Sequence, residues 1–216
     1  MYSLTVKSAF AYVRRAIDEL VSAESIGLLA DPDALDLHKI VEGSIVEAVA
    51  KIHSQAPTLL MEGEVAVRDE DYSLEIEDGV ATIAMLVPAL RVISVKSDDS
   101  DVIVCDLLAE NSPEGRMQLN AYTRGVHDDP RAVLQKKWNG DNMPVIKYYT
   151  TNADDPEFEV EYFPYPVLEE GEVKISPRLE YAVLNEIVAM VLDIYREGNQ
   201  AQIFRAKALE YMGGKG

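Results

Sequence analysis

The residues of this sequence that could do chemistry are one cysteine, three histidines and 38 acidic side chains. Cys105 lies in the apolar run 102–108, which predicts a buried strand. In such surroundings a thiol resists ionisation, so we expect no catalytic thiolate there. His38 and His53 lie about four turns apart on a predicted helix, which is too far for both to bind one metal ion.

Two acidic clusters have simpler interpretations than a site. The run 98–101 gathers carboxylates, which calcium prefers, but it lacks a twelve-residue loop with a closing glutamate. We interpret it as a solvated hairpin loop. The cluster His127-Asp128-Asp129-Pro130 is interpreted as a turn before a strand, because three adjacent side chains do not converge easily.

The common catalytic motifs G-x-S-x-G, G-x-x-x-x-G-K-[ST], G-x-G-x-x-G and H-E-x-x-H are missing from the sequence. Composition alone does not exclude a glycosidase with paired carboxylates, but no two acids stand out. We therefore predict no catalytic, cofactor-binding or metal-binding residues, and we expect the protein not to be an enzyme.

The net charge of −18 indicates which partners the chain avoids. Binding DNA requires several cations that neutralise phosphates, and an acidic surface repels the polyanion. Such repulsion suits a channel through which DNA slides, although acidic charge also simply keeps a protein soluble. The longest apolar run, 80–90, is too short to span a bilayer, and the pattern of the first residues leads us to expect no secretory signal. With a single cysteine, we expect assembly in a reducing cytoplasm.

Apolar periodicity predicts helices near both ends of the chain and strands between them. Helices are expected at 4–22, 32–56, 177–197 and 200–212. The predicted fold class is α+β, a helical bundle formed by N- and C-terminal helices with an inserted antiparallel β region. The expected divisions are 1–60 for the N-terminal helices, 61–170 for the β-rich insertion, and 171–216 for the C-terminal helices and a short tail.

Two stretches of the middle region predict particular strand pairings. Asp78-Gly79 suits a type I′ turn, which would pair Ile76 with Ala81 and Tyr72 with Met85. Residues 157–162 alternate glutamate with apolar side chains, which predicts a strand with one face on a core and the other in water.

The predicted helix 177–197, opened by Ser176 as N-cap, is apolar nearly all round. Such a helix must be covered on more than one side. It is either the core helix of its own subunit, or it lies between that subunit and a neighbour. In the second alternative Leu184, Val188 and Leu192 contact the neighbour.

The stretch 112–150 holds the only tryptophan and has a net charge of +2 in an acidic chain. Ser112-Pro113 predicts an N-cap and first turn of a short helix. A tight loop at 120–125 and two strands, 131–138 and 145–151, are expected to follow.

This order resembles a family of connector proteins from tailed bacteriophages. The resemblance rests on Ser112, Gln118, Asn120, the run Tyr122-Thr123-Arg124-Gly125 and the run Val145-Ile146-Lys147-Tyr148-Tyr149. It is nearest to the neck ring, or head-to-tail adaptor, proteins of crAss-like phages. The resemblance implies a structural virion protein, assembled in the host cytoplasm, that forms a ring between the portal and the tail.

The resemblance also implies partners. These are further copies of the chain in a ring, commonly twelvefold, the portal protein, and adjacent neck or tail rings. Genome DNA is expected to pass through the ring without specific binding, and no membrane is expected as a partner. Basic residues of the central stretch would meet acidic surfaces of a neighbour, or else form salt bridges within the subunit. The expected contact residues are Arg116, Tyr122, Arg124, Lys136, Lys137, Leu184, Val188 and Leu192. A tail-tube or tail-terminator subunit, and a small cytosolic enzyme or binding protein, are the alternatives.

Overall fold

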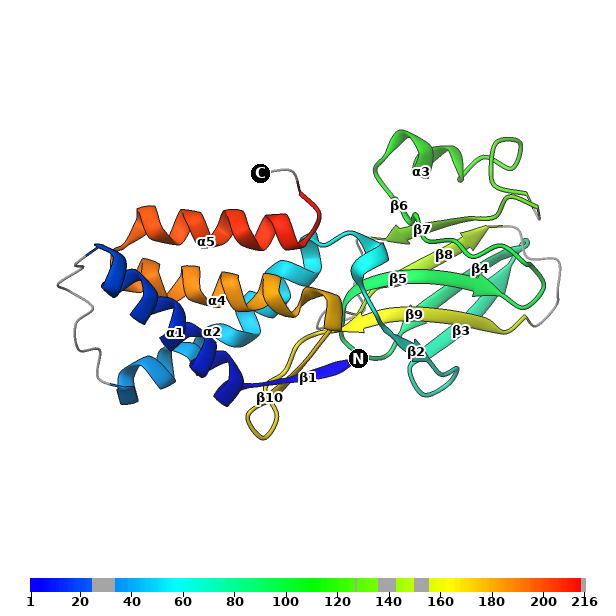
Figure 1. The fold of residues 1–216 in the computed structure, drawn as a ribbon. Coiled ribbons are helices and arrows are strands. Elements are labelled where there is room, and N and C mark those ends of the chain that lie inside the picture. The colour runs from blue at the N-terminus through cyan, green and yellow to red at the C-terminus, as the bar shows by residue number, and fades with distance from the viewer. Residues whose placement is uncertain (25–33, 127, 136–142, 150–155, 215–216) are drawn as a thin grey trace. The chain divides into compact units, whose positions relative to one another are not determined.

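The structure is a computed structural model that describes residues 1–24, 34–126, 128–135, 143–149 and 156–214. They form two compact units (Figure 1). Met1–Glu62 and Pro166–Gly216 make the first, which we call the helical unit. Gly63–Tyr165 make the second, which we call the sheet unit.

The helical unit combines four α-helices with one small sheet. Its strands β1 and β10 pair antiparallel, with Leu4 opposite Val173. Both of these side chains are buried, which anchors the sheet to the helices. The elements are β1 (Tyr2–Thr5), α1 (Val6–Glu24), α2 (Ala34–Gln55), the 3-10 helix η1 (Thr58–Leu60), β10 (Glu172–Ile175), the 3-10 helix η2 (Pro177–Leu179), α4 (Glu180–Ile194) and α5 (Gly198–Tyr211).

Helix α4 is the centre of the helical unit. It packs against α1, α2 and α5, and residues 182–189 are all buried. A helix that is apolar nearly all round must be covered on more than one side. Of the two alternatives for this helix, the structure therefore has the first, a core helix of its own subunit.

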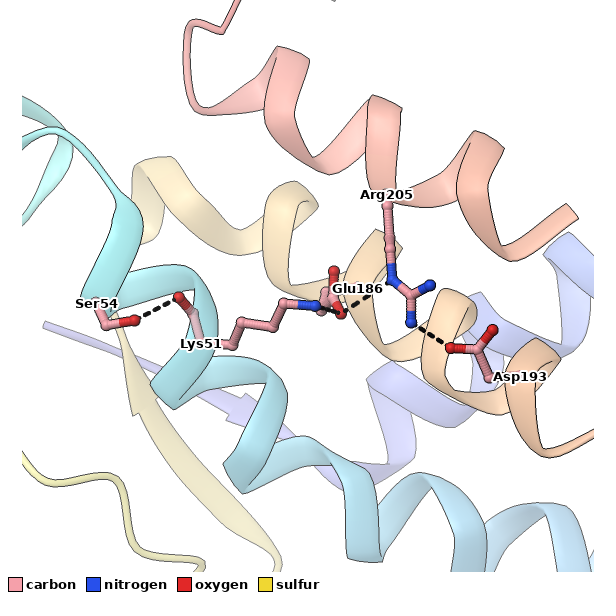
Figure 2. A network of polar contacts seen from close by, with 5 residues as sticks. All are labelled: Lys51, Ser54, Glu186, Asp193 and Arg205. Atoms are coloured by element: carbon pink, nitrogen blue, oxygen red, sulfur yellow. Dashed lines mark hydrogen bonds and ion pairs between the residues drawn. The ribbon is translucent and has the colours of Figure 1, made fainter. Parts of the chain in front are cut away.

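A polar network connects α2, α4 and α5 within this apolar packing (Figure 2). The Glu186 side chain is 3% exposed, and its Oε1 accepts a hydrogen bond from Lys51 Nζ at 2.6 Å. Arg205 Nε lies 3.8 Å from the same oxygen, and Arg205 Nη2 pairs with Asp193 Oδ2. Two cations therefore compensate a carboxylate that burial would otherwise destabilise.

The sheet unit contains two sheets and one short helix. One sheet has the order β2-β9-β5, and the other has the order β3-β4-β8-β7-β6. The elements are β2 (Glu64–Ala66), β3 (Tyr72–Glu77), β4 (Val80–Met85), β5 (Ala89–Ser97), β6 (Leu108–Ala109), α3 (Pro113–Met117), β7 (Arg131–Gln135), β8 (Val145–Tyr149) and β9 (Phe158–Pro164).

The two sheets of this unit share one hydrophobic core, to which both contribute buried side chains. The Tyr72 hydroxyl of β3 donates to the Phe158 carbonyl of β9 at 2.9 Å. The Tyr148 ring of β8 meets the Phe158 ring edge-on, with centroids 5.1 Å apart. Buried aromatic pairs of this geometry hold facing sheets in one arrangement.

The hairpin predicted at 72–85 is confirmed. Tyr72 pairs with Met85 and Ile76 with Ala81, in the predicted register. Asp78 and Gly79 both have positive φ, 51° and 72°, as a type I′ turn requires. The alternating strand at 157–162 is also confirmed as part of β9, where Phe158, Val160 and Tyr162 are buried.

The predicted fold class was wrong in its architecture. The described residues form a mixed, sheet-rich α+β fold with five α-helices and ten strands in three sheets. The terminal segments do not form a bundle of helices alone, because β1 and β10 pair within them. The middle region is not purely antiparallel either, because β6 runs parallel to β7. The short β1 was missed because its four residues precede a much stronger helical pattern.

One local prediction failed, and another held only in part. The run 102–108 is not a buried strand, since Val104 forms only an isolated bridge to Val95, Leu108 alone belongs to a strand, β6, and Ile103 and Cys105 are exposed. A continuous apolar run does not by itself show that both of its faces are covered. Ser176 is the N-cap residue of η2 and Pro177 lies in its first turn, as predicted, but the Ser176 side chain makes no capping hydrogen bond. Its hydroxyl instead accepts from the Glu62 N–H at 3.0 Å.

Candidate interaction surface

The candidate site lies on α3 and the loop after it, residues 112–126, which we call the platform. Ser112 is the N-cap of α3, as predicted, and its Oγ accepts from the Gly115 N–H at 2.9 Å. Pro113 occupies the first turn, where its missing N–H costs nothing. This short helix therefore begins where the sequence requires it to begin.

Side-chain hydrogen bonds hold the loop of the platform closed. The buried Gln118 side chain donates to the Glu114 carbonyl at 3.2 Å and accepts from the Gly125 N–H at 2.7 Å. The Thr123 hydroxyl donates to the Met117 carbonyl at 2.7 Å. These bonds replace the regular ladders that a loop lacks, so the platform has one defined conformation.

Gly115 lets the platform lie close to the rest of the sheet unit. A Cβ at this position would lie 2.2 Å from the Ala109 carbonyl oxygen, inside the contact distance of any real side chain. Only glycine allows this approach of one backbone segment to another.

The platform displays large apolar side chains to solvent. Tyr122 is 96% exposed and Leu119 is 74% exposed. Met117 and Val126 are also exposed, and Met117 lines a shallow hollow of 560 Å³ together with Arg116 and Asn120, among others. Apolar groups gathered on a fixed surface are typical of an interaction site, and tyrosine is among the residues that contribute most to binding.

The basic residues of the central stretch that the structure describes have different surroundings. Arg116 is exposed, whereas the half-buried Arg124 donates from Nη2 to the Asp78 carbonyl at 3.3 Å within its own unit. Arg131 pairs with Asp129 at 2.7 Å. Lys136 and Lys137 lie outside the described residues. Arg124 therefore makes a contact within its own unit, but to a backbone carbonyl, and not the salt bridge that the second alternative expected.

Three of the expected contact residues are in the core of the helical unit. Leu184, Val188 and Leu192 are all buried by the chain's own side chains. A neighbouring subunit does not reach them in this conformation. Sequence periodicity identified these residues as needing cover but could not identify what covers them.

Of the candidate chemical groups, the structure brings together only the acidic run 98–101 and Asp128 of the cluster 127–130, among the described residues. His53 is buried in the helical unit, and burial lowers its pKa to about 4. Asp98, Asp99, Asp101 and Asp128 line a hollow of 240 Å³. Among the described residues, no group of three or more histidine, cysteine, aspartate or glutamate side chains is placed to hold a metal ion.

The sequence reasoning identified Tyr122 but missed Leu119, Met117 and Val126. Their only signal is that large apolar residues stand in and just before a loop, without helical or strand periodicity. No helix in the described part of the chain is long and apolar enough to cross a membrane. No family model matches the chain, and no curated protein matches its sequence.

Proposed function

We propose that the protein is a non-enzymatic structural subunit of a bacteriophage neck, in which copies form a ring that connects the portal to the tail. The observation that carries the proposal is the platform. A loop that is fixed by its own hydrogen bonds and displays Tyr122 and Leu119 is suited to contact another protein. The order of elements around it also supports the resemblance on which the ring is based.

The charge distribution supports a role as a conduit. Between residues 63 and 165 there are 21 aspartates and glutamates and 9 lysines and arginines. A wall with an excess of negative charge repels DNA phosphates, so the genome slides through without being held. Binding of duplex DNA at physiological salt would contradict this part of the proposal.

The test is assembly on the portal. The full chain is mixed with purified portal protein of the same phage, and the complex is isolated by gel filtration and imaged by electron microscopy. The expected result is a ring of subunits, twelve by the resemblance, stacked on the portal. A portal that elutes without the chain, at micromolar concentrations of both, would contradict the proposal.

A second candidate is a tail-tube or tail-terminator subunit. The observation that favours it is the sheet-rich fold, with ten strands among the described residues, since such subunits are expected to be dominated by sheets. The same experiment separates the two, because this candidate assembles with tail proteins and not with the portal.

A further inference from the structure

Three tyrosines from three helices meet on the surface of the helical unit, and we call them the tyrosine cluster. Tyr12 lies on α1, Tyr181 in the first turn of α4, and Tyr211 at the end of α5. The Tyr181 ring stacks on the Tyr211 ring, with centroids 5.5 Å apart and planes inclined by 25°. The Tyr12 ring meets the Tyr181 ring edge-on at 6.4 Å. Because α4 packs against both α1 and α5 (Figure 1), the helices hold the rings in one arrangement.

The tyrosine cluster leaves aromatic surface in water. Tyr181 is 54% exposed and Tyr211 is 50% exposed, although each ring already contacts a neighbour. Tyrosines that are fixed in this way lose little entropy on binding, and they are among the residues that contribute most to protein interfaces. The faces of their rings attract cations. The cluster therefore suits a ligand with a positive charge.

The charge acting on the cluster also favours a cation. Burial raises the pKa of the Tyr12 hydroxyl, and a hydrogen bond from the Asn185 side chain lowers this pKa in part. The other groups that act on the hydroxyl are Tyr211, Tyr181 and Glu19, of which only the acid Glu19 is charged at neutral pH. None of the described groups that act on it is a cation, so positive charge at the cluster is uncompensated by the chain's own bases.

Three basic residues of the described chain lie one helical turn from these tyrosines, and each has other surroundings. Arg178 donates from Nη1 to the Leu59 carbonyl at 3.1 Å. The Nζ atom of Lys207 lies 4.5 Å from the centroid of the Phe204 ring. Arg15 lines a hollow on α1 together with two acids. The position over the tyrosine rings is therefore left for a cation from elsewhere.

A buried amide beside the cluster indicates which kind of cation fits. Asn185 lies one turn after Tyr181 and is 1% exposed. Its Nδ2 donates to the Tyr181 carbonyl at 2.7 Å, which fixes the orientation of the amide because a carbonyl cannot donate. The Asn185 Oδ1 atom is buried and accepts no hydrogen bond from any residue that the structure describes. A buried acceptor without a donor costs free energy, so a ligand with N–H donors is favoured.

We propose that the tyrosine cluster binds an arginine side chain of another protein. A guanidinium is a planar cation that stacks on tyrosine rings and carries five N–H donors. It matches both the ring faces of Tyr181 and Tyr211 and the acceptor of Asn185, whereas a quaternary ammonium ion matches only the rings. The inference goes beyond the proposed neck role and does not depend on it, because the cluster and the platform belong to different units.

The test is a titration of the full chain, with isotope-labelled tyrosine, by a capped tripeptide that carries arginine between two glycines. The ring resonances of Tyr12, Tyr181 and Tyr211, assigned from single phenylalanine variants, are expected to shift and saturate at millimolar peptide. Tyr181→Leu keeps an apolar side chain but removes the ring, and is expected to weaken binding at least about fivefold. Tyr181→Phe keeps the ring and is expected to bind within about twofold of the wild type.

Two changes of ligand separate charge from hydrogen bonding. A tripeptide with citrulline, which has nearly the shape of arginine but no charge, is expected to bind at least about fivefold more weakly. Asn185→Leu removes the amide oxygen. It is expected to weaken binding of the arginine peptide about threefold and to leave binding of tetramethylammonium, which has no N–H, unchanged.

Tyr165→Leu, at an exposed tyrosine of the sheet unit, is the matched control and is expected to bind like the wild type. Circular dichroism verifies that each variant is folded. Equal affinity for the arginine and citrulline peptides, or resonances of the cluster that do not shift, would overturn the inference. Self-association of the wild type in sedimentation velocity that Tyr181→Leu abolishes would assign the site to a second copy, and would overturn the choice of a different protein.

Discussion

The Nε2 atom of His53 accepts a hydrogen bond from the Ser176 N–H at 3.0 Å, connecting the end of α2 to the start of η2. The other ring nitrogen, Nδ1, lies 3.0 Å from the Val49 carbonyl oxygen. This pair of partners fixes the neutral tautomer, with the proton on Nδ1. The ring is completely buried, so protonation would bring an unpaired charge into the core.

The first prediction is that the free energy of unfolding decreases when the pH is lowered, because of His53. Burial lowers its pKa from 6.5 to about 4 in the folded state, so between these values the unfolded chain binds more protons. Stability is therefore complete above pH 6.5 and is progressively lost as the pH falls towards 4. The loss is about 3 kcal/mol, to be measured by urea unfolding across this range.

The control is His53→Gln, which keeps an acceptor for Ser176 but does not titrate. This variant is expected to be less stable than the wild type at pH 7, with a weaker dependence on pH between 6.5 and 4. Equal pH dependence in the two proteins would show that carboxylates, and not His53, cause the loss.

The second prediction concerns the buried Glu186. Lys51→Ala removes its nearest cation and leaves a carboxylate in the core, with only Arg205 at 3.8 Å. The expected loss of unfolding free energy is about 3 kcal/mol, measured by chemical denaturation. Glu186→Gln is expected to lower the unfolding free energy by less, about 1 kcal/mol. The Lys51 side chain is 37% exposed, so water can solvate its charge when the carboxylate is replaced.

Lys39→Ala on the same helix provides the comparison for the Lys51 variant. Lys39 is exposed, and its replacement is expected to change stability by less than about 0.5 kcal/mol. A Lys51→Ala protein as stable as the Lys39→Ala protein would contradict the importance of this ion pair.

The third prediction compares two glycines. Gly115→Ala places a methyl group against the Ala109 carbonyl, so the platform must shift, at a cost of about 2 kcal/mol. Gly43→Ala lies in α2 with nothing within 4 Å of the added methyl. It is expected to stabilise the protein by about 1 kcal/mol, because alanine loses less entropy in a helix. Thermal unfolding of both variants tests the opposite signs.

The fourth prediction is that Gln118 holds the platform closed. Gln118→Ala leaves the Gly125 N–H without its acceptor, at a cost of about 1–2 kcal/mol. Amide hydrogen exchange over 118–126 is expected to accelerate at least about tenfold, since opening of the loop becomes easier by that free energy. Gln202→Ala, at an exposed position of α5, is expected to leave this exchange unchanged. Unaltered exchange in the Gln118 variant would show that other bonds fix the loop.

Local patterns in the sequence determined several elements on their own. Asp78-Gly79 fixed the hairpin register, because a type I′ turn requires positive φ at both residues and these two types tolerate it. Ser112-Pro113 fixed the start of α3, and the alternation at 157–162 fixed which face of β9 is buried. In each case the interactions that decide the structure lie within a few residues of one another.

Only the tertiary structure decided which apolar surfaces are covered. Helix α4 was predicted to need cover on more than one side, and its own unit supplies it, so Leu184 is buried. In helix α5 the spacing puts Ile203 and Leu209 on one apolar face, yet both are about half exposed, and the buried aromatic side chain is that of Phe204. Periodicity shows which residues share a helix face, but which face is buried depends on neighbours far away in the chain.

Strand β1 and the exposed side chains of the platform also depend on parts of the chain that are distant in sequence. Tyr2–Thr5 is a strand because β10, about 170 residues later, offers it a partner. Tyr122 and Leu119 are exposed because Gln118 and Gly125 turn the loop outward and no described segment covers it. Long-range pairing and burial are properties of the whole chain, so a local pattern does not determine them.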